Sequence, residues 1–441
     1  MQFPDTIFAL SSGRPPSGVA VIRLSGPHSR LALEAIAGKV PPARRAVLSD
    51  FRSTSGDLID RGLVLFFAEP ASFTGEDCAE LHVHGGRAVV DAMTGALSRI
   101  PGLRAAEAGE FTRRAFLNGK MDLTEAEALA DLISAETEAQ RRFSVVSAGG
   151  AQSSIYTGWR KRIVHARAMI EAELDFADEG DVPGSVSDQV WQDVAALVGE
   201  IGTHVEGFHR AEIIREGYSV VIAGAPNAGK SSLINALARR DVAIVTDEPG
   251  TTRDLVHVAL DLDGVKVVVT DTAGIREGAG KVETIGIERA LESVRKADLV
   301  VLLEDMSTPA GLTFPESQAE RLRVGSKADL VDRRLVSAGG HFDLTISVKT
   351  GEGVDQLLGL IANKAGAAIG AVESLLPARA RHVALLREAA GRLTGSLREG
   401  ADLEVRAEEL RLASQAFGKI AGTVDVEEVL GVIFSEFCIG K

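Results

Sequence analysis

The sequence predicts an α/β domain inserted between two segments of an all-α domain, with an α+β domain in front of them. Three observations predict this fold class. Short apolar runs at 218–223, 265–270, 299–303 and 344–347 alternate with helical patterns between residues 216 and 371. Helical patterns flank that stretch on both sides, and the first 118 residues hold short strands between turn residues. The chain has 441 residues, enough for several domains.

The N-terminal segment, residues 1–118, has the mixed pattern of an α+β domain. Residues 19–24 and 63–67 are expected to be strands because they are apolar and bounded by turn residues. A dense cluster of polar residues and glycines, SFTGEDCAELHVHGG, occupies 72–86. Cys78 within it is expected to be a core residue. His82 and His84 stand near Glu80, but no further ligand is apparent, so we do not expect a metal there.

Helical patterns form the second domain. Thr124 and Glu127 fit a capping box, and apolar residues then recur at helical spacing. The pattern runs to about residue 215, apart from a loop near 179–187, and returns after about 378. We therefore expect a helical domain made of residues 119–215 and 372–441, with the α/β domain of 216–371 inserted into it, because exposed loops tolerate insertions.

Composition restricts the possible functions. The net charge of −14 argues against a general nucleic-acid binder, so RNA would be contacted through a local basic patch or a partner. The basic clusters 141–142 and 160–162 are candidates for that contact, or simply solvated helix faces. Two cysteines, Cys78 and Cys438, favour a reducing compartment. No long apolar run or signal peptide is apparent, so we expect a cytoplasmic protein without a membrane contact.

The inserted domain carries a phosphate-binding motif. Residues 224–231, GAPNAGKS, match G-x-x-x-x-G-K-[ST], with an apolar run before them and a helical pattern at 232–237 after them. Lys230 is expected to reach the β- and γ-phosphates and Ser231 to bind Mg²⁺. Backbone N–H groups would surround the phosphates. The residues expected to line this P-loop are Asn227, Ala228, Gly229, Lys230, Ser231 and Ser232.

Three further motifs follow in the order typical of a guanine-nucleotide site. Asp271, at the end of an apolar run, is placed to hold Mg²⁺ through water, and Gly274 to sense the γ-phosphate, with Thr272 and Ala273 between them. Ser326-Lys327-Ala328-Asp329 resembles N-K-x-D, with Ser326 in place of asparagine. A carboxylate such as Asp329 accepts from two adjacent N–H donors that guanine has and adenine lacks, so a buried acid here would reject ATP. Ser347, Val348 and Lys349 are expected to support the base. The inserted domain is thus expected to be a Ras-like P-loop GTPase domain, although Ser326 could loosen the base-binding loop.

In Ras-like GTPases, a glutamine directly after the glycine that senses the γ-phosphate orients the attacking water. Here Ile275 occupies that place after Gly274, so another group must orient the water. The candidate switch region, TDEPGTT, supplies Thr252 as a second Mg²⁺ ligand. Asn227 and backbone carbonyls of the switch could enclose a monovalent cation beside the phosphates. Glu283 is the candidate for orienting water, or else a surface acid. The switch residues expected at the nucleotide are Thr246, Asp247, Glu248, Pro249, Gly250, Thr251 and Thr252.

Along its whole length the chain resembles the MnmE (TrmE) family of tRNA-modification GTPases. The terminal FCIGK is highly specific to that family. The stretches that carry the resemblance are 5–7, 72–86, 118–123, 224–237, 246–254, 271–277, 285–290 and 437–441.

The resemblance implies potassium activation, with Asn227, Thr246, Glu248 and Thr251 matching the potassium loop and Glu283 the proposed catalytic acid. It also implies a folate one-carbon donor, a 5-formyl or methylene tetrahydrofolate. Arg23, Glu80, Lys120 and Lys441 match the family's folate positions. From sequence alone, Arg23 and Glu80 could equally be an ordinary surface pair. Cys438 is either a reactive thiol or a residue that packs the terminal helix.

The partners implied by the resemblance are a second copy, through the N-terminal domain, and the FAD-containing protein MnmG in a heterotetramer. Together they would install an aminomethyl-type group on C5 of the wobble uridine, position 34, of certain tRNAs. The alternative is a ribosome-assembly GTPase switch of the Era or Der kind, which shares the central P-loop domain. That alternative leaves the SFTGED and FCIGK segments without a role.

Overall fold

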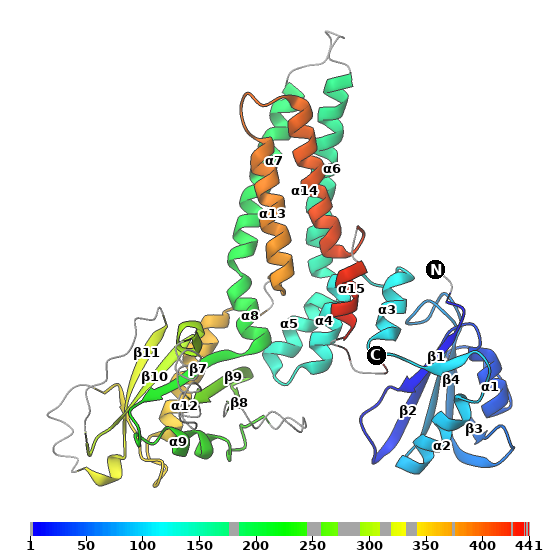
Figure 1. Ribbon diagram of the computed structural model, residues 1–441, viewed down its shortest axis with the longest axis horizontal. Coiled ribbons are helices and arrows are strands. Elements are labelled where there is room, and N and C mark those ends of the chain that lie inside the picture. The colour runs from blue at the N-terminus through cyan, green and yellow to red at the C-terminus, as the bar shows by residue number, and fades with distance from the viewer. Residues whose placement is uncertain are drawn as a thin grey trace, which may run out of the picture. The chain divides into compact units, whose positions relative to one another are not determined.

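The computed structural model describes residues 3–175, 185–244, 257–271, 292–308, 319–331, 342–372, 375–424, 427–435, 437 and 440. The chain divides into two compact units (Figure 1). The first comprises residues 1–130, 148–175 and 407–441, and the second comprises 131–147 and 176–406. None of the helices among these described residues is both long and apolar enough to cross a bilayer. The domain boundaries expected at residues 118, 215 and 371 stay a prediction.

The first unit contains a six-stranded sheet with the order β3-β4-β5-β2-β1-β6. Its strands are antiparallel except that β6 runs parallel to β1. The runs predicted at 19–24 and 63–67 are confirmed as parts of β2 and β4. The strands are β1 (Thr6–Leu10), β2 (Ser17–Ser25), β3 (Val47–Arg52), β4 (Leu58–Phe67), β5 (Cys78–Gly85) and β6 (Leu103–Ala105).

The two faces of this sheet differ because side chains alternate along each strand. One face is covered by α1 (Ser29–Ala37) and α2 (Arg87–Leu97), and its core includes Ile22 and Leu81. On the other face, Phe111 of α3 (Glu110–Leu117) packs on β1. The part of that second face that α3 does not cover is partly exposed to solvent, with Leu48 and Leu63 among its exposed residues. We call it the open face.

Helices complete the first unit. The aromatic side chains of α6 (Ala151–Asp175) and α14 (Leu403–Ala421) pack together, with the ring centres of Trp159 and Phe417 5.9 Å apart. Helix α15 (Glu427–Ser435) packs against the start of α4 (Leu123–Ser134) through a small apolar cluster.

The predicted capping box at Thr124 and Glu127 is wrong by two residues. Asp122 Oδ1 accepts from the Glu125 backbone N–H at 3.0 Å, and Glu125 Oε2 accepts from the Asp122 N–H at 2.8 Å. Asp122 therefore occupies the capping position, and both Thr124 and Glu127 are buried within the helix that follows.

The second unit contains another six-stranded sheet, with the order β12-β11-β10-β7-β9-β8. All neighbouring strands are parallel except β8, which is antiparallel to β9. The predicted apolar runs are confirmed as strands, although the last of them pairs only over its first two residues. The strands are β7 (Tyr218–Gly224), β8 (His257–Leu262), β9 (Val265–Asp271), β10 (Leu299–Asp305), β11 (Glu320–Ser326) and β12 (Leu344–Thr345).

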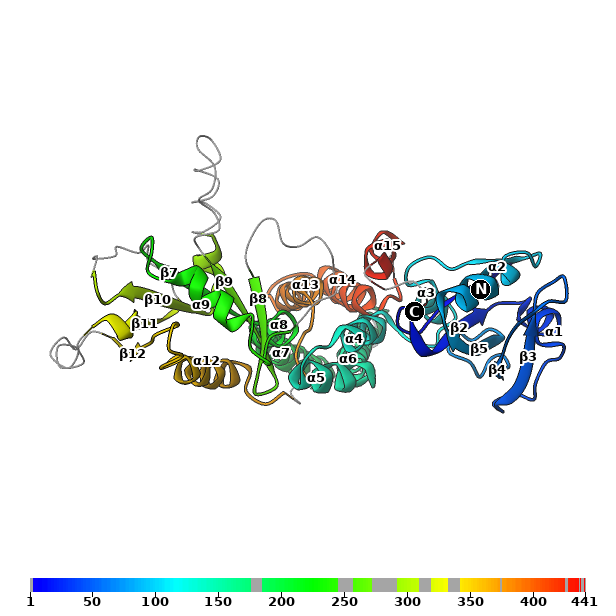
Figure 2. The same cartoon turned by 90° about the horizontal axis from the view of Figure 1, so that it is seen from below.

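Helices of the second unit pack against this second sheet (Figure 2). One core joins the sheet to α9 (Lys230–Leu237) and α12 (Val354–Ile369), while helical residues 292–296 supply Val294 to the opposite face. This arrangement confirms the predicted α/β domain.

In the described part of the second unit, the further α-helices are α5 (Glu138–Ala148), α7 (Ser185–Glu206), α8 (Phe208–Glu216) and α13 (Ala380–Ser396). We expected a loop near 179–187. Residues 179–184 of it lie outside the described part of the chain. Residues 185–187 are already helical, so that part of the expectation is wrong.

Candidate functional site

The P-loop joins β7 to α9 at the carboxyl edge of the second sheet. Gly229 precedes the helix with φ +98°, a left-handed conformation that favours glycine. Lys230 is buried, and its Nζ donates to the carbonyls of Gly224 and Ala225, both at 2.9 Å. The ammonium group is therefore held directly beside the loop that the motif predicts as a phosphate cradle.

Two side chains with oxygen atoms suited to Mg²⁺, those of Ser231 and Asp271, lie next to this loop. Strands β7 and β9 are parallel neighbours, so Ser231 at the start of α9 meets Asp271 at the end of β9. The Ser231 hydroxyl donates to Asp271 Oδ2 at 2.8 Å, and Asp271 is buried. A hydroxyl and a carboxylate are ligands that suit Mg²⁺, so these two residues fit the predicted metal site.

The expectation that Ser326 loosens the base-binding loop stays a prediction, but the structure shows which groups its side chain contacts. Its side chain is buried, and its Oγ lies 2.7 Å from the Ala228 carbonyl and 3.1 Å from the Glu304 carbonyl. The short serine hydroxyl thus bonds the base-binding loop directly to the P-loop. This contact connects residues that are 98 positions apart in the chain.

The other base-loop residues are also held in place. Lys327 Nζ lies 2.6 Å from Asp305 Oδ2, and Asp329 Oδ1 accepts from the Ser347 hydroxyl at 2.7 Å. Burial alone would raise the pKa of Asp305, but hydrogen bonds from Lys327 and Ser307 outweigh it and hold that pKa below its usual range.

Two features of this loop differ from the sequence interpretation. Asp329 is exposed, whereas we expected a buried acid at this position. Asp305 did not enter the sequence interpretation, although its position two residues after the apolar run 299–303 was a usable signal.

Of the remaining P-loop and base-loop predictions, Asn227 is exposed with φ +64°, and Ser232 lies on the first turn of α9. Val348 is half-buried against the core and Lys349 is exposed, both directly after Ser347. The other predicted nucleotide and catalytic residues lie outside the described part of the chain. They are Thr246, Asp247, Glu248, Pro249, Gly250, Thr251, Thr252, Thr272, Ala273, Gly274 and Glu283.

A second group of predicted residues meets on the open face of the first sheet. Arg23 of β2 and Glu80 of β5 are paired across the strands, with Nη2 and Oε1 3.1 Å apart. His82 Nε2 lies 3.3 Å from the other carboxylate oxygen of Glu80. His84 instead contacts Asp60, at 2.9 Å. Within the described residues no cluster of metal-ligating side chains is found.

Lys120 and the C-terminal tail belong to the same unit. Lys120 Nζ donates to the Pro70 carbonyl at 2.9 Å. Lys441 and Cys438 lie outside the described residues, but Gly440 accepts a 2.7 Å hydrogen bond from the Ser11 hydroxyl. Ser11 in turn donates its backbone N–H to Val21 of β2, two residues before Arg23. Cys78 is buried, as predicted, with its Sγ 3.1 Å from the Thr74 hydroxyl.

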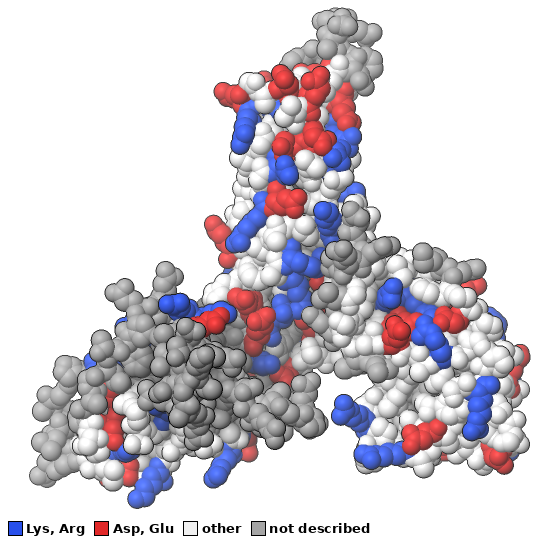
Figure 3. Space-filling model, in the orientation of Figure 1, with Lys and Arg blue, Asp and Glu red and all other residues white. Residues whose placement is uncertain are grey.

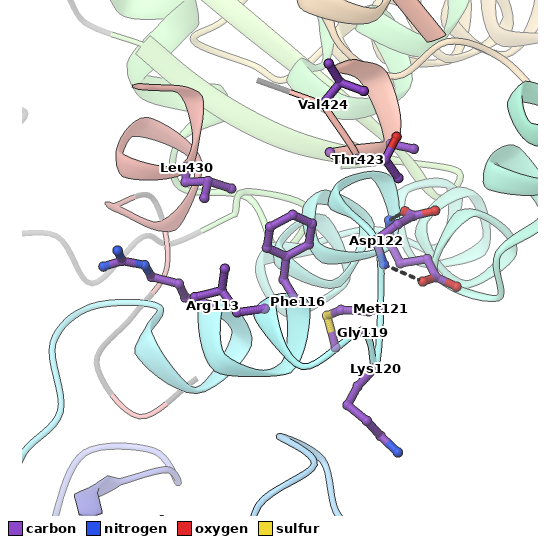
Figure 4. Close-up of a pocket in the computed structure, with 13 residues that line it drawn as sticks. Arg113, Phe116, Gly119, Lys120, Met121, Asp122, Thr423, Val424 and Leu430 are labelled. Atoms are coloured by element: carbon purple, nitrogen blue, oxygen red, sulfur yellow. Dashed lines mark hydrogen bonds between the residues drawn. The ribbon is translucent and has the colours of Figure 1, made fainter. Parts of the chain in front are cut away.

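A pocket of about 1070 Å³ opens beside the loop before α4. It is lined by parts of α3, the start of α4, the end of α14 and Leu430 of α15 (Figure 4). In Figure 4 the Lys120 side chain points away from Phe116 and Asp122, on the side of the loop that faces the sheet. Both acids of the pocket, Asp122 and Glu125, form the helix cap described above, and burial raises the pKa of Glu125.

Comparison with known proteins covers the whole chain. The family profile for the MnmE helical domain matches residues 123–438, and that for the GTP-binding protein TrmE N-terminus matches 6–120. A protein of Mesorhizobium japonicum named tRNA modification GTPase MnmE is 61% identical over 439 residues, which are 99% of each chain. A protein of the same name from Chelativorans sp. is 57% identical, over 99% of this chain and 98% of its own.

Among solved structures, the G domain of the FeoB iron transporter of T. maritima matches 33% of this chain and 98% of its own at 25% identity, with a TM-score of 0.25. The identification therefore rests on the sequence relatives and profiles. The activity in the name of these relatives, a GTPase, agrees with a nucleotide-binding domain of the kind described above. The chain belongs to the MnmE family of tRNA modification GTPases.

Proposed function

We propose that this chain is a potassium-activated GTPase that modifies C5 of the wobble uridine, position 34, of certain tRNAs. It acts together with the FAD-containing partner MnmG and a reduced folate as one-carbon donor. The observation that carries the nucleotide part is the contact between Ser231 and Asp271, because it joins the phosphate and metal motifs in one place. The Ser326–Ala228 contact adds the base-binding loop to the same site.

The nucleotide chemistry divides among residues with separate tasks. Lys230 neutralises phosphate charge, Ser231 and Thr252 bind Mg²⁺, and Glu283 orients the attacking water. Asn227, Thr246, Glu248 and Thr251 would hold a potassium ion, which would supply positive charge where negative charge develops during hydrolysis. The exposed Asn227 side chain on the P-loop supports this assignment.

The folate part is supported by the open face of the first sheet. Arg23 and Lys120 are cations suited to the carboxylates of a folate tail, and Glu80 suits the amine of the pterin. Gly440, which precedes Lys441, is bonded to Ser11 near that same face. We assign Lys441 as the fourth folate residue from the family resemblance, and Cys438 either reacts there or packs the terminal segment.

Homodimer formation is supported by apolar side chains on the same open face. Val19, Leu48 and Leu63 are 56%, 54% and 42% exposed on three strands of one sheet. Paired strands place Leu48 next to Leu63, and Leu63 next to His82. Exposed apolar side chains that share one face are typical of a protein interface, and a second copy is the partner we assign to it.

Contact with tRNA is expected to be local or shared with MnmG. On the side of the molecule seen in Figure 3, acidic and basic side chains are interspersed over the described residues, without a continuous basic surface. The predicted basic cluster at Arg141 and Arg142 is already paired with Glu138, at 2.7 and 2.8 Å. Because nucleic-acid affinity depends on phosphate neutralisation, these arginines are weak candidates for a strong tRNA site.

The experiment that tests the proposal is mass spectrometry of tRNA nucleosides from cells that lack this gene, with and without a restored wild-type copy. We expect the C5-modified wobble uridine to disappear on deletion and to return on restoration. Ribosomal subunit profiles from the same cells test the ribosome-assembly alternative. Unchanged nucleosides together with disturbed subunit profiles would replace the proposal by that alternative.

A further inference from the structure

Phe73 is a large aromatic side chain exposed beside the proposed folate residues. It is 37% exposed and belongs to none of the buried apolar clusters found among the described residues. The Arg23 guanidinium lies over its ring, 5.6 Å from the ring centre, while the same guanidinium is bonded to Glu80. Phe73 is thus in contact with Arg23, the residue to which Glu80 is bonded.

The loop that carries Phe73 is fixed by buried polar contacts. Glu76 Oε2 accepts from the Ser25 hydroxyl at 2.6 Å and from Arg114 at 3.3 Å, and the Arg114 side chain is fully buried. Asn118 donates to the Thr74 carbonyl at 2.8 Å. The contacts at Thr74 and Glu76 hold the backbone directly after Phe73 and present the ring in a set position, which lowers the entropy cost of binding a ligand there.

The same loop also contacts Lys120. Gly75 has φ +82°, and a Cβ added there would lie 3.3 Å from the Cγ and Cδ atoms of Lys120. The aliphatic stem of Lys120 therefore lies against the loop two residues after Phe73. One loop touches both cations that the folate proposal needs, and Phe73 is its exposed aromatic residue.

We propose that Phe73 is a further ligand-binding residue of this site, and that the pterin ring of a reduced folate stacks on it. This inference rests on the proposed folate site. A pterin is a flat ring with polar edges, so a site needs edge partners and an apolar face. Glu80 supplies the edge acceptor, and Phe73, in contact with Glu80's partner Arg23, supplies the face.

The test is calorimetric titration of the full chain with 5-formyltetrahydrofolate. We expect Phe73→Ala to raise Kd about tenfold and Phe73→Tyr to leave it within about threefold, because tyrosine keeps the ring. Leu31→Ala is the matched control, since Leu31 is 46% exposed on α1, and its Kd should equal that of wild type. In Phe73→Trp, ligand should quench the added indole emission along the calorimetric isotherm.

The outcomes separate this inference from the function on which it rests. If wild type binds and Phe73→Ala binds within twofold of it, the stacking role is wrong and the folate site stands. If wild type shows no binding at millimolar folate, both fall. Should Phe73→Ala fail to fold by circular dichroism, the Phe73→Trp arm decides, and unchanged emission at saturating ligand overturns the inference.

Discussion

Replacing Ser326 by alanine removes one hydroxyl at the point where the base-binding loop meets the P-loop. In the structure that hydroxyl lies 2.7 Å from the Ala228 carbonyl and 3.1 Å from the Glu304 carbonyl, in a buried position. Alanine fits the same space, so the change removes the hydrogen bond with little loss of packing. The buried Ala228 carbonyl and the partly buried Glu304 carbonyl then lose their contact with this donor.

The expected size of the effect follows from the energetics of hydrogen bonds. A typical intramolecular hydrogen bond contributes roughly 1 kcal/mol, and a buried group left unsatisfied costs about 1–3 kcal/mol. A loss of about 1.4 kcal/mol in the bias toward the binding-competent loop arrangement corresponds to about a tenfold weaker affinity for GTP. We therefore expect Ser326→Ala to raise Kd for GTP about tenfold.

The assay is displacement of a fluorescent guanine nucleotide from the purified full chain. Ser98→Ala is the control, because the Ser98 hydroxyl also donates to a backbone carbonyl, at 3.0 Å, but is exposed at the end of α2 in the other unit. The control should bind GTP like wild type. A Ser326→Ala protein that folds normally and binds GTP within twofold of wild type would refute the inferred link between the two loops.

Three further predictions concern the same site. Lys230→Ala should abolish tight GTP binding, because it removes the cation beside the phosphate cradle, and submicromolar affinity in a titration would contradict the P-loop assignment. Asp329→Asn should shift preference from GTP towards xanthosine triphosphate in a competition assay, since an amide can donate to the replacing carbonyl. Unchanged guanine selectivity would show that Asp329 does not contact the base. GTP turnover should be much faster in potassium than in sodium at equal ionic strength, and equal rates would remove the monovalent-cation assignment.

Local patterns predicted most of the second sheet. Its apolar runs are buried strands, and motifs placed at their carboxyl ends come together because parallel neighbours end at one edge. For this reason the contact between Ser231 and Asp271 could be expected from the sequence. The capping box was misplaced because acidic and hydroxyl residues at 122–127 allow two registers, and only the backbone geometry distinguishes Asp122 from Thr124.

Contacts between distant segments could not be predicted in the same way. The Ser326–Ala228 bond spans 98 residues and the Ser11–Gly440 bond spans 429, so no local periodicity encodes either of them. Strand β8 was also missed, because its alternation of buried and exposed residues is short and lacks a motif. The pairing of Arg23 with Glu80 depends on the register of β2 and β5, which is set by the core on the opposite face.

The central claim is that the P-loop, Asp271 and the 326–329 loop form one guanine-nucleotide site. Its most direct test is competition between GTP and ATP for a fluorescent GDP analogue bound to the full chain in magnesium. We expect GTP to displace the analogue. ATP should leave the analogue bound even at about a hundredfold higher concentration than that of GTP, because a missing pair of base hydrogen bonds costs several kcal/mol. Displacement by ATP at the same concentration as GTP would contradict the claim.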